Sequence, residues 1–230
     1  MKKDELEKKV KKKENLEGID LERAKLKGAN LKKAQLNGAN LDRADLSKAS
    51  LKGADLNKAS LERANLIQAE FRGASLIQSN LNEALMHKAD FRDANLEKST
   101  LVEAELNKAD FQGAKLERSD LTKAQLNDGN FKDCDLDHVI LERADLSGAN
   151  FKDAQIRNAN LERANLSGAN LQDADLKNAN LTRANFTGAN LTGADLRATN
   201  LEFADFTDAK GLTEEQIEEI VDQGGTVSAE

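Results

Sequence analysis

Residues 29–48, ANLKKAQLNGANLDRADLSK, contain four copies of one five-residue unit, and the unit repeats without a break from Leu16 to Phe206. Every fifth residue in that stretch is large and apolar: of these 39 central positions 30 are Leu, seven are Phe, one is Met86 and one is Ile156. Two residues before each central position stands a small residue, which is Ala in 30 of the 39 cases. The repeating unit is therefore A-[DN]-L-x-x.

A period of five fits neither a helix nor a plain strand, although Ala, Leu, Glu, Lys and Arg are all good helix formers. A helix turns by about 100° per residue, so successive central residues would point in directions about 140° apart and share no face. A strand alternates with period two, so each new unit would point its central residue to the opposite side. We therefore expect the small and central residues to point inward, the residue between them outward, and the next two to form a turn.

A second period of twenty sets the number of units in one circuit. Three unrelated substitutions follow it: Phe at the central position, Ser at the small position, and Arg two residues after the centre. Four units should therefore complete one circuit, and the phenylalanines of one column should stack inside. The Phe and Ser columns comprise Phe71, Phe91, Phe111, Phe131, Phe151, Ser79, Ser99 and Ser119.

This pattern resembles that of the pentapeptide-repeat family, and the resemblance covers about 195 of the 230 residues. It implies an all-β solenoid, a right-handed quadrilateral β-helix of about ten coils whose shaft is filled by side chains. With coils about 4.8 Å apart, the rod would be about 45 Å long. By the same resemblance, glycines at the second corner residue, such as Gly28 and Gly53, would distinguish different turn types.

The two ends of the chain leave the repeat, which divides the chain into residues 1–13, 14–209 and 210–230. Residues 1–13 carry seven Lys and three acidic residues, with Leu6 and Val10 spaced for one helical face, so they form either a short capping helix or a solvated tail. The alternative is that these lysines contact nucleic acid or an acidic surface. Residues 210–230 should form a capping helix and a tail, with Phe203 and Phe206 contacting the helix. The predicted cap residues are the N-cap Thr213, its partner Gln216, and the apolar Leu212, Ile217, Ile220 and Val221.

Composition limits the compartment and the chemistry. The formal net charge is −7, and no apolar run approaches the roughly 20 residues of a membrane span. The basic N-terminus is not followed by the apolar segment of a signal peptide, so a cytoplasmic protein that does not bind membranes is expected. Cys134 replaces Ala at an inward position, which predicts a buried, inert thiol; a redox or modification role is the alternative.

The sequence offers no constellation typical of an enzyme, a metal site or a cofactor site. His87 and His138 have no second ligand at metal-binding spacing. The carboxylates one residue before the centre arise from the motif itself, and we expect them to bond to nearby corner amides. We therefore predict a protein without catalytic residues, metal or cofactor. The carboxylates concerned include Asp45, Asp55, Asp90, Asp110, Asp120 and Asp145.

Five apolar residues stand at outward positions in the middle of the repeat: Ile67, Ile77, Leu85, Val102 and Ile140. They form the candidate interaction patch, with scattered exposed residues as the alternative. The first functional hypothesis is therefore a non-enzymatic scaffold for protein–protein interaction whose partner the sequence does not identify. A homodimer formed through a coil end or through this patch is a further hypothesis.

The second functional hypothesis comes from the family resemblance, because some pentapeptide-repeat proteins mimic duplex DNA and bind DNA gyrase. Residues 14–209 contain 26 basic and 32 acidic residues, which leaves a net charge of only −6. A DNA mimic needs rows of acidic groups without intervening cations. In this sequence the charges of opposite sign are interleaved, so gyrase binding is the less favoured reading and direct binding of nucleic acid is not expected.

Overall fold

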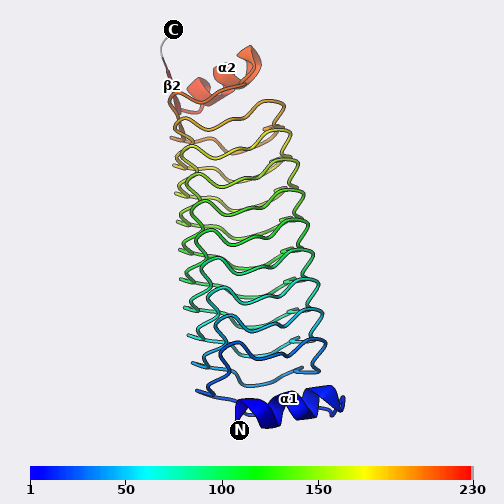
Figure 1. Cartoon of the computed structure of the whole chain (residues 1–230). Helices are drawn as coiled ribbons and strands as arrows, with labels where there is room; N and C mark the ends of the chain where they lie inside the picture. Colours follow the sequence, from blue (N-terminus) through cyan, green and yellow to red (C-terminus); the bar gives the residue numbers. More distant parts are fainter. Residues whose placement is uncertain (229–230) are drawn as a thin grey trace.

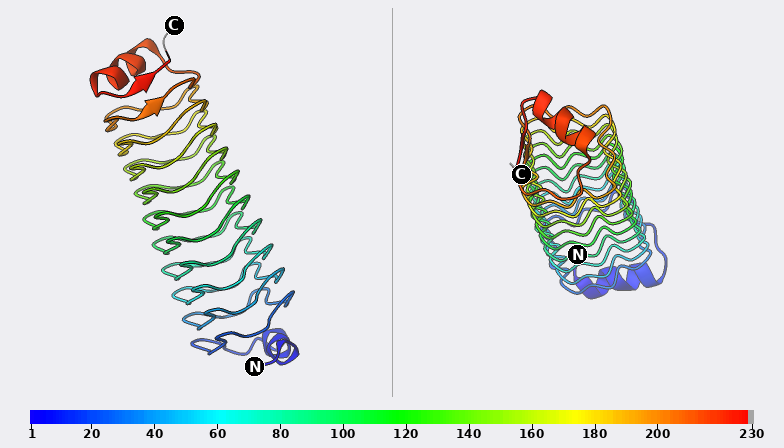
Figure 2. Two further views of the ribbon diagram at one scale, coloured as in Figure 1. Left: turned by 90° about the vertical axis from the view of Figure 1, so that its left-hand side faces the viewer. Right: turned by 90° about the horizontal axis from the view of Figure 1, so that it is seen from above.

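The structure, a computed structural model, describes residues 1–228. Its elements in chain order are helix α1 (Lys3–Lys11), strand β1 (Asp205–Phe206), helix α2 (Glu214–Asp222) and strand β2 (Thr226–Val227). Between α1 and β1 the chain winds into a stack of similar coils, with one helix at each end (Figures 1 and 2). The predicted right-handed quadrilateral β-helix is confirmed.

Neighbouring coils are joined by parallel backbone pairing between residues twenty positions apart, from Asp20 with Asn40 to Asn190 with Lys210. The amide of Leu21 donates to the carbonyl of Asn40 at 2.7 Å, and the amide of Asn40 donates back to the carbonyl of Ile19 at 2.9 Å. Each side of a coil contributes a very short paired segment before the chain turns. The circuit of four units, inferred from the substitution columns, is therefore the one that the structure adopts.

Each corner is a turn closed by a hydrogen bond from the small residue to the preceding central residue, as from Ala24 N to Leu21 O at 3.0 Å. The second corner residue always has a positive φ, 56° at Arg23 and 64° at Gly28, which is the type II arrangement. Glycine therefore does not mark a different kind of turn here, contrary to the expectation. Lys, Arg and Asp adopt the same left-handed backbone because the coil-to-coil pairing fixes it.

The shaft is filled by the central and small residues. The rings of Phe71, Phe91, Phe111, Phe131 and Phe151 stack with centroids 4.7–4.9 Å apart and planes within 8° of one another. Inward serines are satisfied locally; the hydroxyl of Ser99, for example, donates to Leu96 O at 2.6 Å. The core consequently has no lumen for a substrate along this stack, and the functional surfaces are the sides and the ends.

Helix α1 lies across the first coil and buries Leu6 completely, with Val10 packed against the core. Two of its side chains take the places of backbone groups that a preceding coil would supply. Glu7 accepts a hydrogen bond from the amide of Asn30 at 2.8 Å, and Lys3 donates to the carbonyl of Lys27 at 3.1 Å. The helix therefore covers part of the exposed backbone edge of the first coil.

Helix α2 begins at the N-cap Thr213, which forms a reciprocal capping box with Gln216. After α2 the chain returns along the last coil, where β2 pairs in parallel with β1. Of the apolar residues assigned to its packing side, Ile220 is fully buried, but Ile217 and Val221 are exposed by 37% and 53%. That part of the prediction is wrong.

The inward stripe of α2 is instead Gln216, Ile220 and Gln223, which are spaced i, i+4 and i+7. Gln216 donates to Ala194 O at 2.9 Å, and Gln223 accepts from Leu201 N at 2.7 Å. The stripe is largely polar because the end of a coil presents unpaired backbone groups as well as apolar side chains.

The two phenylalanines expected to contact the cap behave differently. Phe206 is buried at a central position, whereas Phe203 is a corner residue and is 56% exposed. The guanidinium of Arg183, one coil below, lies 5.7 Å from the Phe203 ring centroid. Phe203 therefore lies on the outer edge of the rod, with its ring beside Gly224, which follows α2, and not in the core. Leu212 is partly buried against the core.

Candidate interaction surface

The five outward apolar residues do not form one patch. Ile67 and Ile77 lie on diagonally opposite corners of the shaft, because they are ten residues apart in a circuit of twenty. Val102 lies on a third corner. Ile140 lies on the side that leads to that corner, but two coils further along the rod, with the coil of Asp120 between Val102 and Ile140. The structure brings only Ile67 and Leu85 together.

Ile67 and Leu85 are neighbours because they belong to the same side and corner of adjacent coils. The amide of Leu66 donates to Leu85 O at 2.7 Å, and the amide of Gln68 donates to His87 O at 3.0 Å. Leu85 therefore stacks on Asn65, and His87 lies directly above Ile67. All three side chains are half-buried, so each keeps part of its surface open to a partner.

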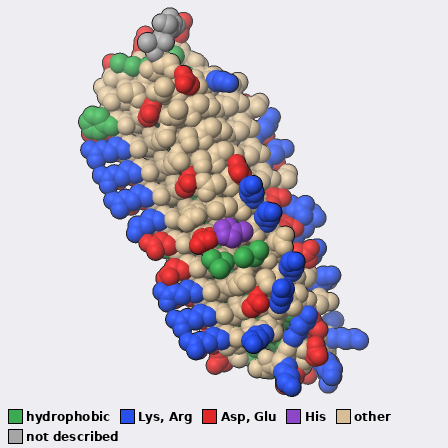
Figure 3. Space-filling view, turned by 60° about the vertical axis from the view of Figure 1, so that its left-hand side comes forward, with side chains coloured by type: hydrophobic (Ala, Val, Ile, Leu, Met, Phe, Trp, Pro, Cys, Tyr) green, Lys and Arg blue, Asp and Glu red, His purple; other side chains and the backbone are tan. Residues whose placement is uncertain are grey.

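A fourth side chain completes this group. Nε2 of His87 lies 2.8 Å from Oε2 of Glu105, which stands one coil above Leu85 in the same column. The His87 and Glu105 side chains are 32% and 40% exposed. We call Ile67, Leu85, His87 and Glu105 the lateral cluster. It combines two apolar side chains with a histidine and a carboxylate, and Figure 3 shows a histidine beside hydrophobic side chains on that face.

Sequence reasoning paired Ile67 with Leu85 but missed His87 and Glu105. Both are found by writing the sequence in rows of twenty, because His87 then falls in the column of Ile67 and Glu105 in that of Leu85. Elsewhere these two columns hold mostly small or polar residues. The lateral cluster is therefore a local departure from the repeat, in a position where the fold does not require one.

The columns of acidic residues are occupied by structural roles. Oδ1 of Asp45 accepts from the amide of Ser47 at 3.1 Å, and Oδ1 of Asp90 from the amide of Arg92 at 3.1 Å. The side chain of Arg92 also lowers the pKa of Asp90, despite partial burial. Because its pKa is lowered, the Asp90 carboxylate is a poor proton donor and does not match a general acid. The other four carboxylates singled out in the sequence, Asp55, Asp110, Asp120 and Asp145, make the same corner contact.

One edge of the rod carries a column of alternating charge blocks. Three arginines are followed by two glutamates, a lysine and three more arginines, and Figure 3 shows this row of cations broken by acidic side chains. At the break, Arg63 forms two hydrogen bonds to Glu83, at 2.7 and 2.8 Å, and Lys123 bonds to Glu103 at 2.8 Å. The column consists of Arg23, Arg43, Arg63, Glu83, Glu103, Lys123, Arg143, Arg163 and Arg183.

Acidic residues in the adjoining column face these arginines, as Glu22 faces Arg23 at 3.3 Å and Glu162 faces Arg163 at 3.8 Å. The edge is therefore a mixture of both signs and does not resemble the uniform phosphate rows of a duplex.

On the side of the rod next to the one that carries Leu85, the residues towards α2 form a row of asparagines. Asn190, Asn170, Asn150 and Asn130 form a ladder in which each side-chain amide donates to the residue one coil below, at 3.1–3.2 Å. The ladder ends on Asp110, to which Asn130 donates at 2.8 Å. These amides are occupied with one another, which makes this half of the face polar and regular. Leu85 and Glu105 of the lateral cluster lie on the neighbouring side of the rod, across the corner that holds Ile67 and His87.

The remaining candidates for chemistry are isolated. Cys134 is buried, its Sγ lies 2.8 Å from Phe111 O, and burial raises the pKa of its thiol to about 12. Within residues 1–228, no group of three or more His, Cys, Asp or Glu side chains is placed to hold a metal ion. The helices of the described chain include none that is both long enough and apolar enough to span a bilayer.

Comparisons with known proteins agree with this fold. Family models described as "Pentapeptide repeats" match residues 130–168, 144–183 and 169–210, and the model of the "Pentapeptide repeat region" matches residues 24–101 and 64–141. A search of curated protein sequences returned no match.

Among solved structures, HetL from the cyanobacterium Nostoc sp. strain PCC 7120, involved in heterocyst differentiation regulation, is 32% identical with a TM-score of 0.52. The match covers 93% of this chain and 100% of HetL. Rfr23 from Cyanothece 51142 is 48% identical over 35% of this chain and 54% of its own, with a TM-score of 0.35. QnrB1, a plasmid-mediated fluoroquinolone resistance protein, is 21% identical over 71% of this chain and 86% of its own, with a TM-score of 0.50, and shares the fold. With matching family models over most of its length and a full-length relative, this chain belongs to the pentapeptide-repeat family.

Proposed function

We propose that this protein is a non-enzymatic scaffold that binds another protein through the lateral cluster. The observation that supports the proposal is the position of Ile67 and Leu85, which add apolar surface next to the His87–Glu105 pair on a face that is otherwise polar. A small apolar centre with hydrogen-bonding groups at its border is typical of a protein interface. The stacked core beneath the cluster keeps these four side chains at fixed spacing, so binding requires little ordering.

The experiment uses substitutions that the repeat itself tolerates. Ile67→Ser copies Ser47, and Leu85→Asn copies Asn65, each of which occupies the same column in a neighbouring coil. The double variant should fold normally yet recover at least about tenfold less partner from native host extract. Full burial of such a side chain contributes roughly 1.5–3 kcal/mol, and a partner would bury about half of each of these two half-buried side chains. The matched control, Ile77→Asn, copies Asn57 on the opposite corner and should recover the partner as well as the unaltered protein does.

Equal recovery by the double variant and the control would place the binding surface elsewhere. Binding to DNA gyrase is tested separately, by measuring the supercoiling activity of gyrase with and without the protein. If the double variant still inhibited supercoiling, the functional surface would be the charged edges and not the lateral cluster. The interleaved ion pairs on those edges are the reason that we propose a protein partner bound at the cluster instead.

A further inference from the structure

The two ends of the rod carry opposite charge. Residues 1–13 contain seven lysines and three acidic residues, whereas α2 contains five acidic residues and no basic one. Figures 1 and 2 show α1 and α2 at opposite ends of the stack, so the two helices of one molecule do not meet. Any contact between these charges must therefore involve two molecules.

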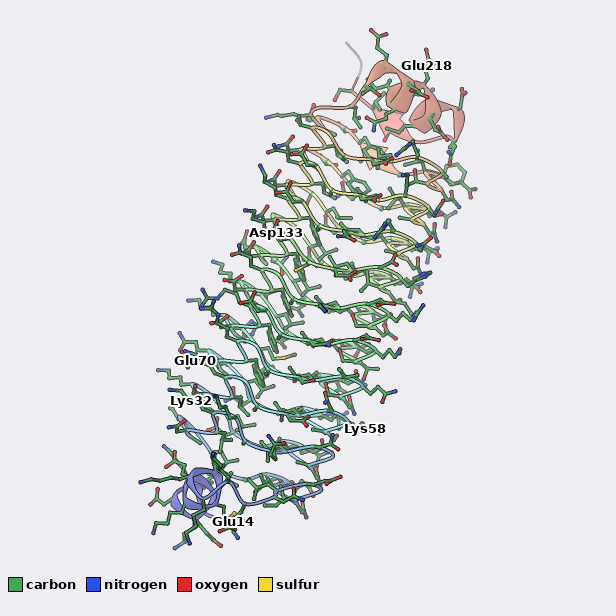
Figure 4. The ribbon with its side chains drawn as sticks, turned by 90° about the vertical axis from the view of Figure 1, so that its right-hand side faces the viewer. Glu14, Lys32, Lys58, Glu70, Asp133 and Glu218 are labelled. Atoms are coloured by element: carbon green, nitrogen blue, oxygen red, sulfur yellow. The ribbon has the colours of Figure 1, made fainter. Side chains whose placement is uncertain are left out.

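The charges at both ends are free to act on a partner. In α1 and the turn after it, Lys3 caps the first coil and Lys9 pairs with Glu14 at 2.8 Å, but Lys8, Lys11, Lys12 and Lys13 are exposed and form no ion pair within residues 1–228. The α2 carboxylates likewise form no ion pair in this part of the chain, and they are exposed. Figure 4 shows Glu218 pointing away from the coils. The five are Glu214, Glu215, Glu218, Glu219 and Asp222.

Exposed apolar side chains are also concentrated at the ends. Of the large apolar residues exposed in the described chain, only Ile140 lies on a side of the rod away from the ends. Met1 lies at the α1 end, and Phe203, Ile217 and Val221 lie at the α2 end. Ile217 and Val221 are four residues apart, so they share one stripe of α2, next to the stripe of Glu218 and Asp222. The α2 end therefore offers an apolar strip bordered by carboxylates.

Charge decides which ends can meet. Two α2 ends would bring carboxylates together, and two α1 ends would bring lysines together, so both symmetric contacts are repulsive. An α2 end facing an α1 end is attractive and also covers Ile217 and Val221 with the aliphatic stems of lysine side chains. We propose that copies of this protein associate head to tail, with α2 of one molecule docked on α1 of the next.

This contact is heterologous and does not close on itself, so it produces linear rows of rods. Three extended residues span only about 10 Å on each side of a coil. The end face is thus well below the roughly 800 Å² per partner of a standard stable interface. The association is consequently weak, and it depends on protein concentration and on salt.

The test combines two variants, each of which removes most of the net charge of one end: −5 becomes −1 in α2, and +4 becomes 0 in residues 1–13. One carries Glu218→Lys and Asp222→Lys in α2, and the other carries Lys8→Glu and Lys12→Glu at the α1 end. In sedimentation velocity at low salt the unaltered protein should grow in mass with concentration, whereas each variant alone should stay monomeric. An equimolar mixture of the two should form dimers, because the unaltered α1 end of the first variant meets the unaltered α2 end of the second. Restored association also shows that both variants are folded.

Salt and cross-linking give independent readouts. Raising the ionic strength from about 0.01 M to about 1 M shortens the Debye length from ~30 Å to ~3 Å, so the apparent Kd should rise at least about tenfold. Variants with one added cysteine, Lys8→Cys and Glu218→Cys, should form mixed disulfides with each other and few homodimers, and buried Cys134 should not interfere. A monomer at every concentration, a mixture that stays monomeric, or efficient homodimers of the Glu218→Cys variant would each overturn the proposal.

Discussion

The side chain of Gln223 accepts a hydrogen bond from the backbone amide of Leu201 at 2.7 Å, where a further coil would place a carbonyl. In the regular coils this amide position always donates to the backbone of the next coil, as Leu181 N does to Asn200 O at 2.8 Å. At the opposite end Glu7 does the same for the amide of Asn30. Both terminal helices thus use side chains to replace some of the missing backbone partners, which covers part of each open edge.

Replacing Gln223 by Ala should therefore loosen the last coil. The substitution leaves the Leu201 amide without its acceptor, and losing such a hydrogen bond costs about 1–3 kcal/mol if the amide stays buried. Hydrogen exchange followed by mass spectrometry or NMR should show faster exchange at Leu201 and little change in the middle coils. Asp222→Ala changes the neighbouring, exposed residue and serves as the control. Equal protection of Leu201 in both variants would show that Gln223 does not cap the coil.

The two isoleucines of α2 should respond very differently to truncation. Ile220 is fully buried, so Ile220→Ala should lower the free energy of unfolding of the C-terminal coils by about 2–5 kcal/mol. Ile217 is exposed, so Ile217→Ala should change it by less than about 0.5 kcal/mol. Urea denaturation monitored at the C-terminal end distinguishes the two, and similar losses in both would mean that α2 packs through another face.

The repeat could be predicted from the sequence because one backbone solution satisfies both periods. Every central residue, such as Phe111, can point inward only if the chain turns after each five-residue unit. Substitutions that recur every twenty residues show that four such units make one circuit. The ends were harder to predict for a physical reason. Apolar spacing correctly located α2 but misplaced Ile217 and Val221, because a coil end also needs hydrogen-bonding partners, and Gln216 and Gln223 supply them.

The candidate surface was predictable only in part. Apolar residues at outward positions identify departures from the repeat. Ile67 and Leu85 are eighteen residues apart in a circuit of twenty, so the sequence predicts that they lie close together on adjacent coils. The same spacing separates Ile77, Val102 and Ile140 from that pair, although all five are apolar residues at outward positions. The contact between His87 and Glu105 depends on side-chain directions in two successive coils, which the spacing of residues does not determine.

The uniform left-handed corners predict a simple stabilising substitution. Ala198 is exposed and has a φ of 57°, a conformation that costs an L-residue about 1–2 kcal/mol. Ala198→Gly removes that cost and adds a smaller entropic loss of roughly 0.5–1 kcal/mol, so the protein should gain about 0.5–1 kcal/mol. Ala179→Gly, at a buried inward site, is the control and should destabilise. Thermal denaturation measures both, and a loss of stability in Ala198→Gly would show that the corner conformation is not strained.

Burial of Cys134 predicts a loss of stability at alkaline pH. The thiol pKa is raised to about 12 in the folded protein, whereas an unfolded thiol ionises near pH 8.5. Above that pH the unfolded chain binds fewer protons than the folded one, so the free energy of unfolding should fall as pH rises towards 12. The slope from this group approaches about 1.4 kcal/mol per pH unit.

Cys134→Ala restores the residue found at most inward small sites and removes the slope, while other titrating groups contribute equally to both proteins. Urea titrations of the two proteins between about pH 8 and 11 measure the difference. Parallel curves would mean that the thiol ionises inside the folded shaft, and Cys134 would then be open to modification after all.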